Sequence, residues 1–153
     1  MLGSSAWSNG SVSPLLEMIV WFATRMRRQA GRRGHFLLID GSVPDGDPEA
    51  EEWLHRVEKW RDPSHGRFLS RKAWEDLARE ARLKVLRSAL HARKQPDLEW
   101  YFETAATPRE NREQVLEAVA KASEHVKAVL RLGSEQGKIV WWWPMLTLLA
   151  SKD

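Results

Sequence analysis

The sequence predicts a mainly α fold, a helical bundle of three to four helices with extended N- and C-terminal segments. The stretch from Ser70 to Lys94 contains no Gly or Pro, starts on a capping serine and carries apolar residues at helical spacing on two faces. Residues 48–60 and 108–133 each carry one apolar stripe at the same spacing. Because a helix that is apolar on two sides packs between neighbours, we expect the bundle to form around residues 70–94.

The length and composition of the chain limit its number of domains and its possible cross-links. With 153 residues, 42% hydrophobic and 29% charged, the chain 1–153 is expected to form a single domain. It has no Cys, which excludes disulfides and thiolate metal sites. Nine Trp in so short a chain point to a heavily contacted subunit, with protein or lipid as the partner.

The N-terminal part predicts an amphipathic basic helix at residues 13–30, starting at Ser13 and Pro14 and ending before Gly31. The basic cluster at its end consists of Arg25, Arg27, Arg28, Arg32 and Arg33. Three interpretations stay open: a mitochondrial targeting helix, a core helix ending in a solvated basic turn, and a helix that binds a membrane surface or nucleic acid. Where this helix lies at the surface of the molecule, we expect the five arginines to contact anionic groups.

Residues 35–40, HFLLID, are consistent with a strand or a buried extended segment. The following loop is rich in Gly, Pro and Asp and resembles a calcium loop. That site is excluded because Gly41 stands where the first carboxylate ligand would be needed. The loop acids are better explained as favourable charges at the start of the next helix.

Residues 48–133 are expected to form the helical core. The aromatic segment after Pro96 favours a helix slightly over a strand, and Thr107, Pro108 and Glu110 predict a capping box for the helix that ends at Gly133. The apolar stripe of that helix is expected to be buried antiparallel on the 70–94 helix. Its valines are Val115, Val119, Val126 and Val129.

Residues 138–150 form a Trp-rich apolar tail that is too short to cross a bilayer and is interrupted by Pro144. Two interpretations remain open: an edge strand that closes the core, or an anchor in a partner or membrane interface. Because adjacent side chains cannot all point to one side, we expect a partner to cover at least one of Trp141, Trp142 and Trp143.

Motifs of catalytic chemistry were not found. The sequence contains no HExxH, GxSxG, phosphate-binding loop or GxGxxG, so it predicts no catalytic residue, no cofactor and no metal site. One enzyme alternative survives: the element order resembles restriction-endonuclease-like toxin domains, with Asp40 and Glu99 as the acids. Tyr101 stands where that motif needs Lys.

One stretch resembles a known family. Residues 85–94, VLRSALHARK, look like a degenerate Leu-Tyr-Arg motif, and residues 108–112 and 117–132 are similar to later parts of the LYR family of small mitochondrial helical proteins. The resemblance covers roughly residues 74–132. It implies an accessory subunit or assembly factor, often held by an acyl carrier protein whose acyl chain enters a three-helix bundle. Arg87, Arg93 and Lys94 would then meet the acidic carrier.

Together these features predict a non-catalytic accessory subunit or assembly factor of a mitochondrial inner-membrane respiratory complex, associated with the matrix side of the membrane. The expected partners are other protein subunits, an acyl carrier protein and anionic lipid. Two alternatives stay open: a basic nucleic-acid or ribosome-associated protein, and the nuclease-like toxin domain.

Overall fold

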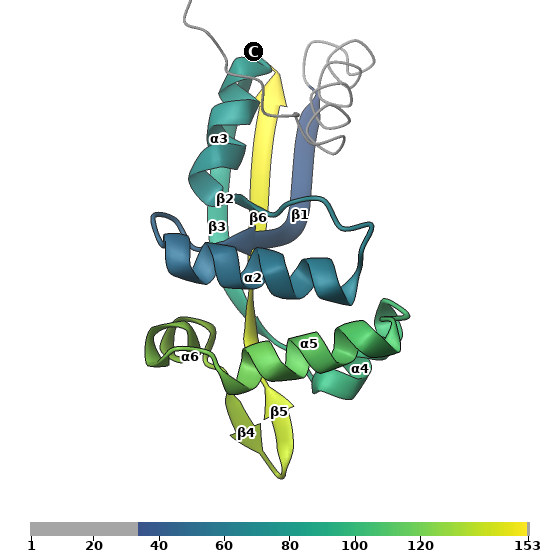
Figure 1. The fold of residues 1–153 in the computed structure, drawn as a ribbon. Helices are drawn as coiled ribbons and strands as arrows, with labels where there is room; N and C mark the ends of the chain where they lie inside the picture. Colours follow the sequence, from purple (N-terminus) through teal and green to yellow (C-terminus); the bar gives the residue numbers. More distant parts are fainter. Residues whose placement is uncertain (1–33, 153) are drawn as a thin grey trace, which may run out of the picture.

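The structure is a computed structural model that describes residues 34–152, and it is built around a mixed four-stranded sheet (Figure 1). The elements are β1 (His35–Val43), α2 (Pro48–Arg61), β2 (Leu69–Ser70), α3 (Arg71–Glu80), β3 (Leu83–Lys94), α4 (Leu98–Thr104), α5 (Arg109–Ala120), α6 (Glu124–Leu130), β4 (Gly133–Glu135), β5 (Lys138–Val140) and β6 (Trp142–Lys152). The predicted helical bundle is therefore wrong.

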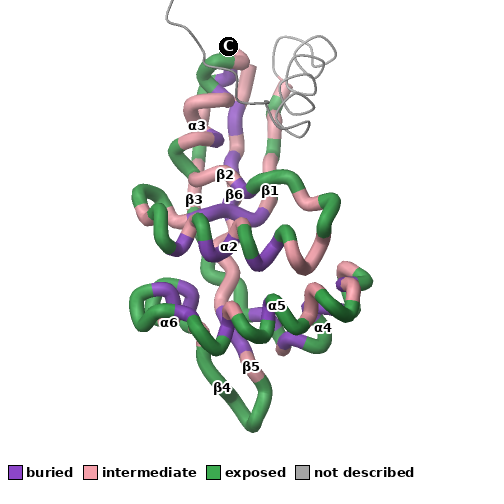
Figure 2. Tube along the Cα trace, in the orientation of Figure 1, coloured by how far each residue is buried: buried purple, intermediate pink, exposed green. Residues whose placement is uncertain are grey.

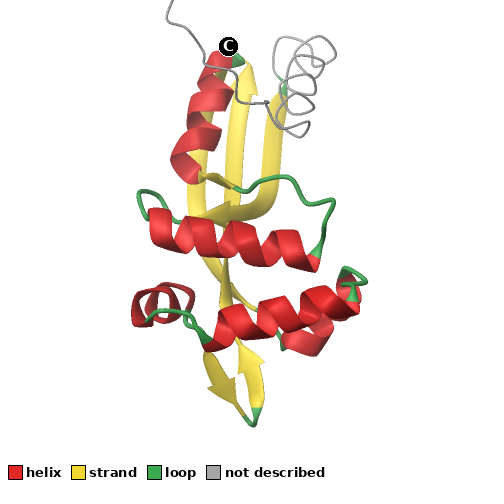
Figure 3. Ribbon diagram, in the orientation of Figure 1, coloured by secondary structure: helices red, strands yellow, loops and turns green. Residues whose placement is uncertain are grey.

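The sheet has the strand order β2-β1-β6-β3, so β6 lies in its centre, antiparallel to both β1 and β3 (Figure 3). Only β1 and β2 run parallel, over two residue pairs. The C-terminal tail is thus a central strand and not the edge strand or detached anchor that its composition suggested. A β-bulge between Val85 and Arg87 shifts the register of β3 against β6.

The expected helix over residues 70–94 divides into a helix and a strand. Its start is as predicted, because the Ser70 side chain accepts a hydrogen bond from Ala73 N at 3.2 Å. The helix stops at Glu80, and Arg82 takes a left-handed conformation with φ 55° before β3 begins. The spacing of Val85, Leu86 and Leu90 fits a helix, but pairing with β6 makes this stretch a strand.

The molecule has two packed regions along the length of the sheet (Figure 1). In the first, α3 covers one face and buries Trp74 and Ala78 against Leu146 and Leu148. In the second, α2, α4, α5 and α6 enclose the lower ends of β3 and β6 (Figure 2). The loop of the β4–β5 hairpin projects from this second region and is exposed.

The helix expected up to Gly133 is two helices, and its valines pack on a different partner than expected. Val115, Val119 and Val126 are buried in the cluster that contains α2 residues, whereas Val129 is partly exposed. Ser123 caps α6 by accepting from Val126 N at 3.1 Å. The predicted capping box is wrong, because α5 begins at Arg109 and the Thr107 hydroxyl has no hydrogen-bond partner within residues 34–152.

The structure also bears on the expected membrane contact, but not on the expected basic helix. Among residues 34–152, no helix has the length and apolar character required to cross a bilayer. The predicted basic helix at 13–30 and its five arginines lie outside the described residues.

Candidate functional site

The site is a pocket of about 310 Å³ beside the carboxyl end of β1, here called the β1 pocket. The pocket is lined by Asp40, Gly41, Glu58, Arg61, His65, Phe68, Arg93, Gln95, Trp100, Trp143 and Met145. These residues come from β1, α2, β3, α4, β6 and the connections after α2 and β3.

Gly41 allows one wall of the pocket to form. A Cβ atom at this position would lie 2.4 Å from Cε1 of Phe68, so no larger residue fits unless the phenyl ring moves. The backbone of Phe68 is held by a 3.0 Å hydrogen bond between the His55 imidazole and the Phe68 carbonyl oxygen. Beside Gly41, the Asp40 carboxylate accepts from Gly41 N at 2.8 Å, and burial raises the pKa of this carboxyl.

His65 is positioned by the loop that follows α2. Asp62 accepts hydrogen bonds from both the amide and the hydroxyl of Ser64, at 2.9 and 2.6 Å, and its carbonyl accepts from His65 N at 2.9 Å. Lys59 Nζ donates to the His65 carbonyl at 3.0 Å. Burial lowers the pKa of the His65 imidazole below 6.5, which favours a neutral ring at pH 7.

Glu58, Arg61 and Tyr101 form a buried polar group at the base of the pocket. Tyr101 Oη donates a short hydrogen bond to Oε1 of Glu58, and Arg61 Nη1 lies 3.1 Å from Oε2. The Arg61 guanidinium also stacks over the Tyr101 ring at 4.3 Å and donates from Nε to the Tyr101 carbonyl at 3.0 Å. Burial raises the pKa of Glu58 and raises that of Tyr101 well above 10.

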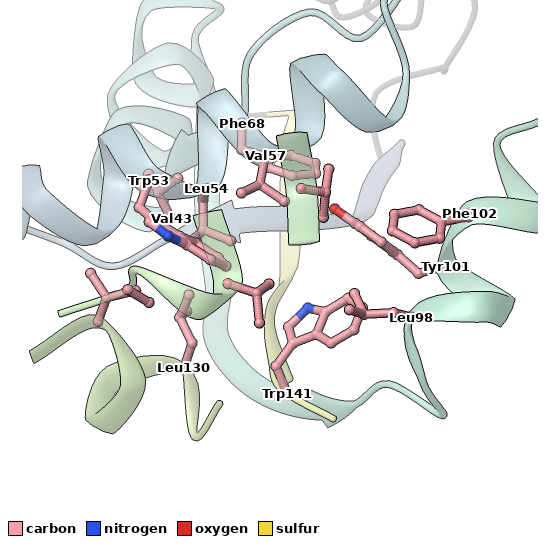
Figure 4. Close-up of a cluster of buried hydrophobic side chains, with 14 residues drawn as sticks. Val43, Trp53, Leu54, Val57, Phe68, Leu98, Tyr101, Phe102, Leu130 and Trp141 are labelled. Atoms are coloured by element: carbon pink, nitrogen blue, oxygen red, sulfur yellow. The ribbon is translucent and has the colours of Figure 1, made fainter. Parts of the chain in front are cut away.

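A row of aromatic rings connects the pocket to the core below it. Trp143 packs edge-on against Phe68 and Tyr101, with centroids 5.6 and 5.9 Å apart, and Tyr101 packs on Trp141 at 4.6 Å. Figure 4 shows Tyr101 placed between Phe102 and Trp141 within the buried cluster. These contacts join the pocket wall to the buried hydrophobic cluster.

Three polar groups of the pocket are without partners in the described part of the chain. His65 Nε2 and Trp143 Nε1 are buried and make no hydrogen bond. The Arg93 guanidinium makes no ion pair or hydrogen bond within residues 34–152. Unpaired polar groups next to a cavity are typical of a site that binds a ligand.

A larger hollow of about 620 Å³ lies between α2 and α5, but its lining residues point less clearly to a ligand. Its rim mixes acids such as Glu52 and Glu117 with the cations Arg56 and Lys121, and Lys121 pairs with Glu117. None of the buried polar atoms that lack a partner belongs to this hollow. The β1 pocket is therefore the stronger candidate site.

The structure separates the residues that the sequence grouped as a partner surface. Arg93 and Trp143 line the β1 pocket, whereas Arg87 is exposed on β3 and Lys94 pairs with Glu135. Trp141 is buried in the core, and Trp142 lies under the Arg131 guanidinium at 5.1 Å. Arg25, Arg27, Arg28, Arg32 and Arg33 lie outside the described residues.

Glu58, Arg61 and His65 were not singled out from the sequence. Glu58 and Arg61 lie one helical turn apart at the end of α2, followed by the turn-forming residues 62–64 and a histidine. A charged pair at the end of a helix, followed by an Asp-Pro turn and a histidine, was the signal in the sequence that could have indicated these pocket residues. Of the two acids considered for a nuclease, Asp40 lines the pocket but Glu99 pairs with Arg112 at the surface.

No protein-family model matches the sequence, and no curated protein matches it either. Several solved structures are similar in fold, and two of them are bacterial proteins. A candidate methyltransferase from Bacillus halodurans has a TM-score of 0.78 and 19% identity, over 87% of this chain and 62% of that one. The YcgJ protein from Bacillus subtilis has a TM-score of 0.75 and 20% identity, over 88% of this chain and 57% of that one. The chain thus spans about three-fifths of the length of both proteins.

This likeness corrects the functional expectations as well as the fold class. The expected non-catalytic accessory subunit of a respiratory complex rested on a helical bundle, and the structure is instead a mixed α/β fold similar to that of a candidate methyltransferase. The nucleic-acid and nuclease alternatives belong to the same corrected expectation. Within residues 34–152, no group of three or more His, Asp or Glu side chains is placed to hold a metal ion. The acyl carrier protein, the lipid contact and the matrix-side location stay predictions.

Proposed function

We propose that this chain is the acceptor-binding part of a methyltransferase and that the β1 pocket holds the group to be methylated. The observation that carries the proposal is a pocket at the carboxyl end of β1 that combines a neutral imidazole, aromatic walls and a guanidinium that has no partner among residues 34–152. The similar fold of a candidate methyltransferase supports the reaction class.

The lining favours a small, planar, anionic acceptor. A volume of about 310 Å³ is at the lower end of the range for small-molecule sites. Phe68, Trp100 and Trp143 offer ring faces and edges, while the Arg93 guanidinium can bind a carboxylate in two parallel hydrogen bonds. An aromatic carboxylic acid fits these three properties.

The second requirement of an acceptor is the loss of a proton, because a hydroxyl or amine that gains a methyl group must release one. A neutral imidazole can accept that proton, and burial keeps the pKa of His65 low enough for the ring to be neutral at pH 7. Glu58 is held by Tyr101 and Arg61 and is less available for this role. We assign the proton-accepting role to His65.

The binding step can be tested on the isolated chain by titrating it with 4-hydroxybenzoate and following tryptophan fluorescence. We expect saturable quenching, with phenol and benzylamine binding at least about tenfold more weakly because they lack the carboxylate that Arg93 would bind. Arg93→Gln should remove this preference. Arg87→Gln is the matched control, since Arg87 is exposed on the same strand and does not line the pocket.

The reaction itself needs the chain together with a source of methyl groups, and transfer of a radiolabelled methyl group to the acceptor is the measurement. His65→Gln should reduce the rate by roughly 10²- to 10⁴-fold, the usual contribution of general base catalysis, with little change in acceptor affinity. Equal rates in the wild type and His65→Gln would contradict the role of His65 as the proton acceptor. Equal affinity for 4-hydroxybenzoate and phenol would contradict an aromatic carboxylic acid as the methyl acceptor.

A further inference from the structure

Two side chains that line the β1 pocket each bury a ring nitrogen without a hydrogen-bond partner among residues 34–152, namely Nε1 of Trp143 and Nε2 of His65. The two atoms are chemically complementary. An indole nitrogen can only donate, whereas one nitrogen of a neutral imidazole accepts. Because burial lowers the pKa of His65, its ring is neutral at pH 7. The pocket therefore offers one hydrogen-bond donor and one acceptor that no described residue uses.

The rings of His65 and Trp143 are close to each other because both contact Phe68. The centroid of the Phe68 ring lies 4.4 Å from that of His65 and 5.6 Å from that of Trp143. Two rings that share one neighbour, in a pocket of about 310 Å³, can both be reached by a single small ligand. The donor and the acceptor thus belong to one binding position.

The acceptor groups of the pocket are already engaged and do not satisfy the Trp143 indole. The Asp40 carboxylate accepts from the next backbone amide at 2.8 Å, and the Glu58 carboxylate accepts from Tyr101 and Arg61. The nearest neighbours of the indole are the Tyr101 ring and the Arg61 guanidinium, neither of which supplies an acceptor in its place. A buried donor in this state favours a ligand that brings an acceptor atom.

We propose, on the basis of the proposed function, that the β1 pocket binds its acceptor through a hydroxyl oxygen that accepts a hydrogen bond from Trp143 Nε1 and donates one to His65 Nε2. A hydroxyl meets both requirements with one atom, because it donates one hydrogen bond and has two acceptor lone pairs. An aromatic amine also donates, but its lone pair is delocalised into the ring, so it leaves the indole N–H unpaired. The acceptor is therefore a phenol and not an aromatic amine.

The carboxylate of the same molecule stays within the reach of Arg93. Arg93 of β3 and Trp143 of β6 are directly paired in the sheet, and directly paired residues place their side chains on the same face. A hydroxybenzoate carries the hydroxyl and the carboxylate on one rigid ring. It can therefore be held at both ends, by the guanidinium at one and by Trp143 and His65 at the other.

The first test compares three ligands that share the ring and the carboxylate: benzoate, 4-hydroxybenzoate and 4-aminobenzoate. Each is titrated calorimetrically into the full 153-residue chain. We expect 4-hydroxybenzoate to bind at least about tenfold more tightly than either of the others, because only the hydroxyl pairs with both buried nitrogens. Equal affinity for the hydroxyl and the amino compound would overturn the inference.

The second test removes the indole N–H with Trp143→Phe, which keeps an aromatic ring. The readout is the ratio of the affinities for 4-hydroxybenzoate and benzoate, since benzoate binding shows that the pocket of the variant is intact. We expect this ratio to fall by at least about fivefold. Trp142→Phe is the matched control and should leave the ratio unchanged, because Trp142 contacts Arg131 and does not line the pocket. An unchanged ratio in Trp143→Phe would overturn the inference.

A third test does not require Trp143→Phe to fold. In the described part of the chain, only Trp100 and Trp143 among the tryptophans line the pocket. With isotope-labelled indole nitrogens, 4-hydroxybenzoate should move one indole proton signal downfield in the nuclear magnetic resonance spectrum, and benzoate should not. The shift should be retained in Trp100→Phe, a position that is 38% exposed on α4. No downfield shift, or a shift lost in Trp100→Phe, would overturn the inference.

The outcomes separate this inference from the proposed function. If benzoate binds and the hydroxyl adds no affinity, the carboxylate site at Arg93 is supported and the role of Trp143 is wrong. If none of the three ligands binds, both the acceptor class and the hydroxyl contact are wrong. If 4-hydroxybenzoate binds with the expected selectivity but is not methylated when a methyl source is supplied, the hydroxyl contact is supported and the assigned reaction is contradicted.

Discussion

Tyr101 Oη donates a hydrogen bond to the carboxylate of Glu58, which is 1% exposed and lies 43 residues away in the sequence. The contact joins α4 to α2 at the base of the β1 pocket. Arg61 completes the arrangement by pairing with the second carboxylate oxygen at 3.1 Å. A buried carboxylate is tolerated here because each of its oxygens has a donor.

Tyr101→Phe should lower the free energy of unfolding by about 1 to 3 kcal/mol, because it leaves one oxygen of a buried carboxylate without a donor. Urea unfolding monitored by circular dichroism measures the change. Phe102→Leu, a neighbouring core substitution that removes no hydrogen bond, is the comparison. If Tyr101→Phe were as stable as the wild type, the Glu58–Tyr101 contact would contribute nothing to stability.

The stability contributed by Glu58 should fall as the pH rises. Burial raises the pKa of this carboxyl above its ordinary value of 4.5, although the Tyr101 hydrogen bond and Arg61 oppose the shift. The folded protein then binds the proton more tightly than the unfolded chain, so stability declines with pH from about 4.5 up to the folded pKa. Urea unfolding from pH 4 to 8 should show the wild type losing more stability than Glu58→Gln over this window. Parallel pH profiles for the two proteins would contradict the raised pKa.

Gly41→Ala should displace the Phe68 ring and weaken acceptor binding in the β1 pocket. The new Cβ atom would lie 2.4 Å from Cε1 and 2.8 Å from Cζ of Phe68, and overpacking of this kind costs about 1 to 3 kcal/mol. Thermal unfolding and the 4-hydroxybenzoate titration are the measurements. Gly133→Ala is the matched control, since nothing lies within 4 Å of a Cβ there. Equal effects of the two substitutions would show that the close approach of Gly41 and Phe68 is unimportant.

Trp141 and Trp142 should respond very differently to truncation although they are adjacent. Trp141 is 4% exposed and packs on Tyr101, so Trp141→Ala should cost about 3 to 5 kcal/mol. Trp142 is only half-buried and contacts Arg131 at the surface, so Trp142→Ala should cost about 1 kcal/mol or less. Chemical unfolding of both variants checks the order. Comparable losses would indicate that Trp142 is also part of the core.

The sequence alone predicted the features that depend on neighbours within one or two helical turns. The Ser70 cap of α3 and the extended run in β1 are confirmed, and the apolar stripe expected over residues 48–60 forms α2, which begins at Pro48. Local hydrogen bonds and the conformational limits of Pro determine these features, so a short window contains the necessary information.

The choice between helix and strand for residues 83–94, and the position of the pocket, depended on the tertiary structure and not on the spacing of apolar residues. Residues 83–94 have apolar spacing that suits a helix, yet they form β3 because residues 142–152 pair with them across the centre of the sheet. The β1 pocket depends on the same long-range pairing, which brings Arg93 and Trp143 opposite each other and places them near Arg61 of α2. Strand pairing is a contact between distant segments, so neither the strand nor the pocket could be derived from local spacing.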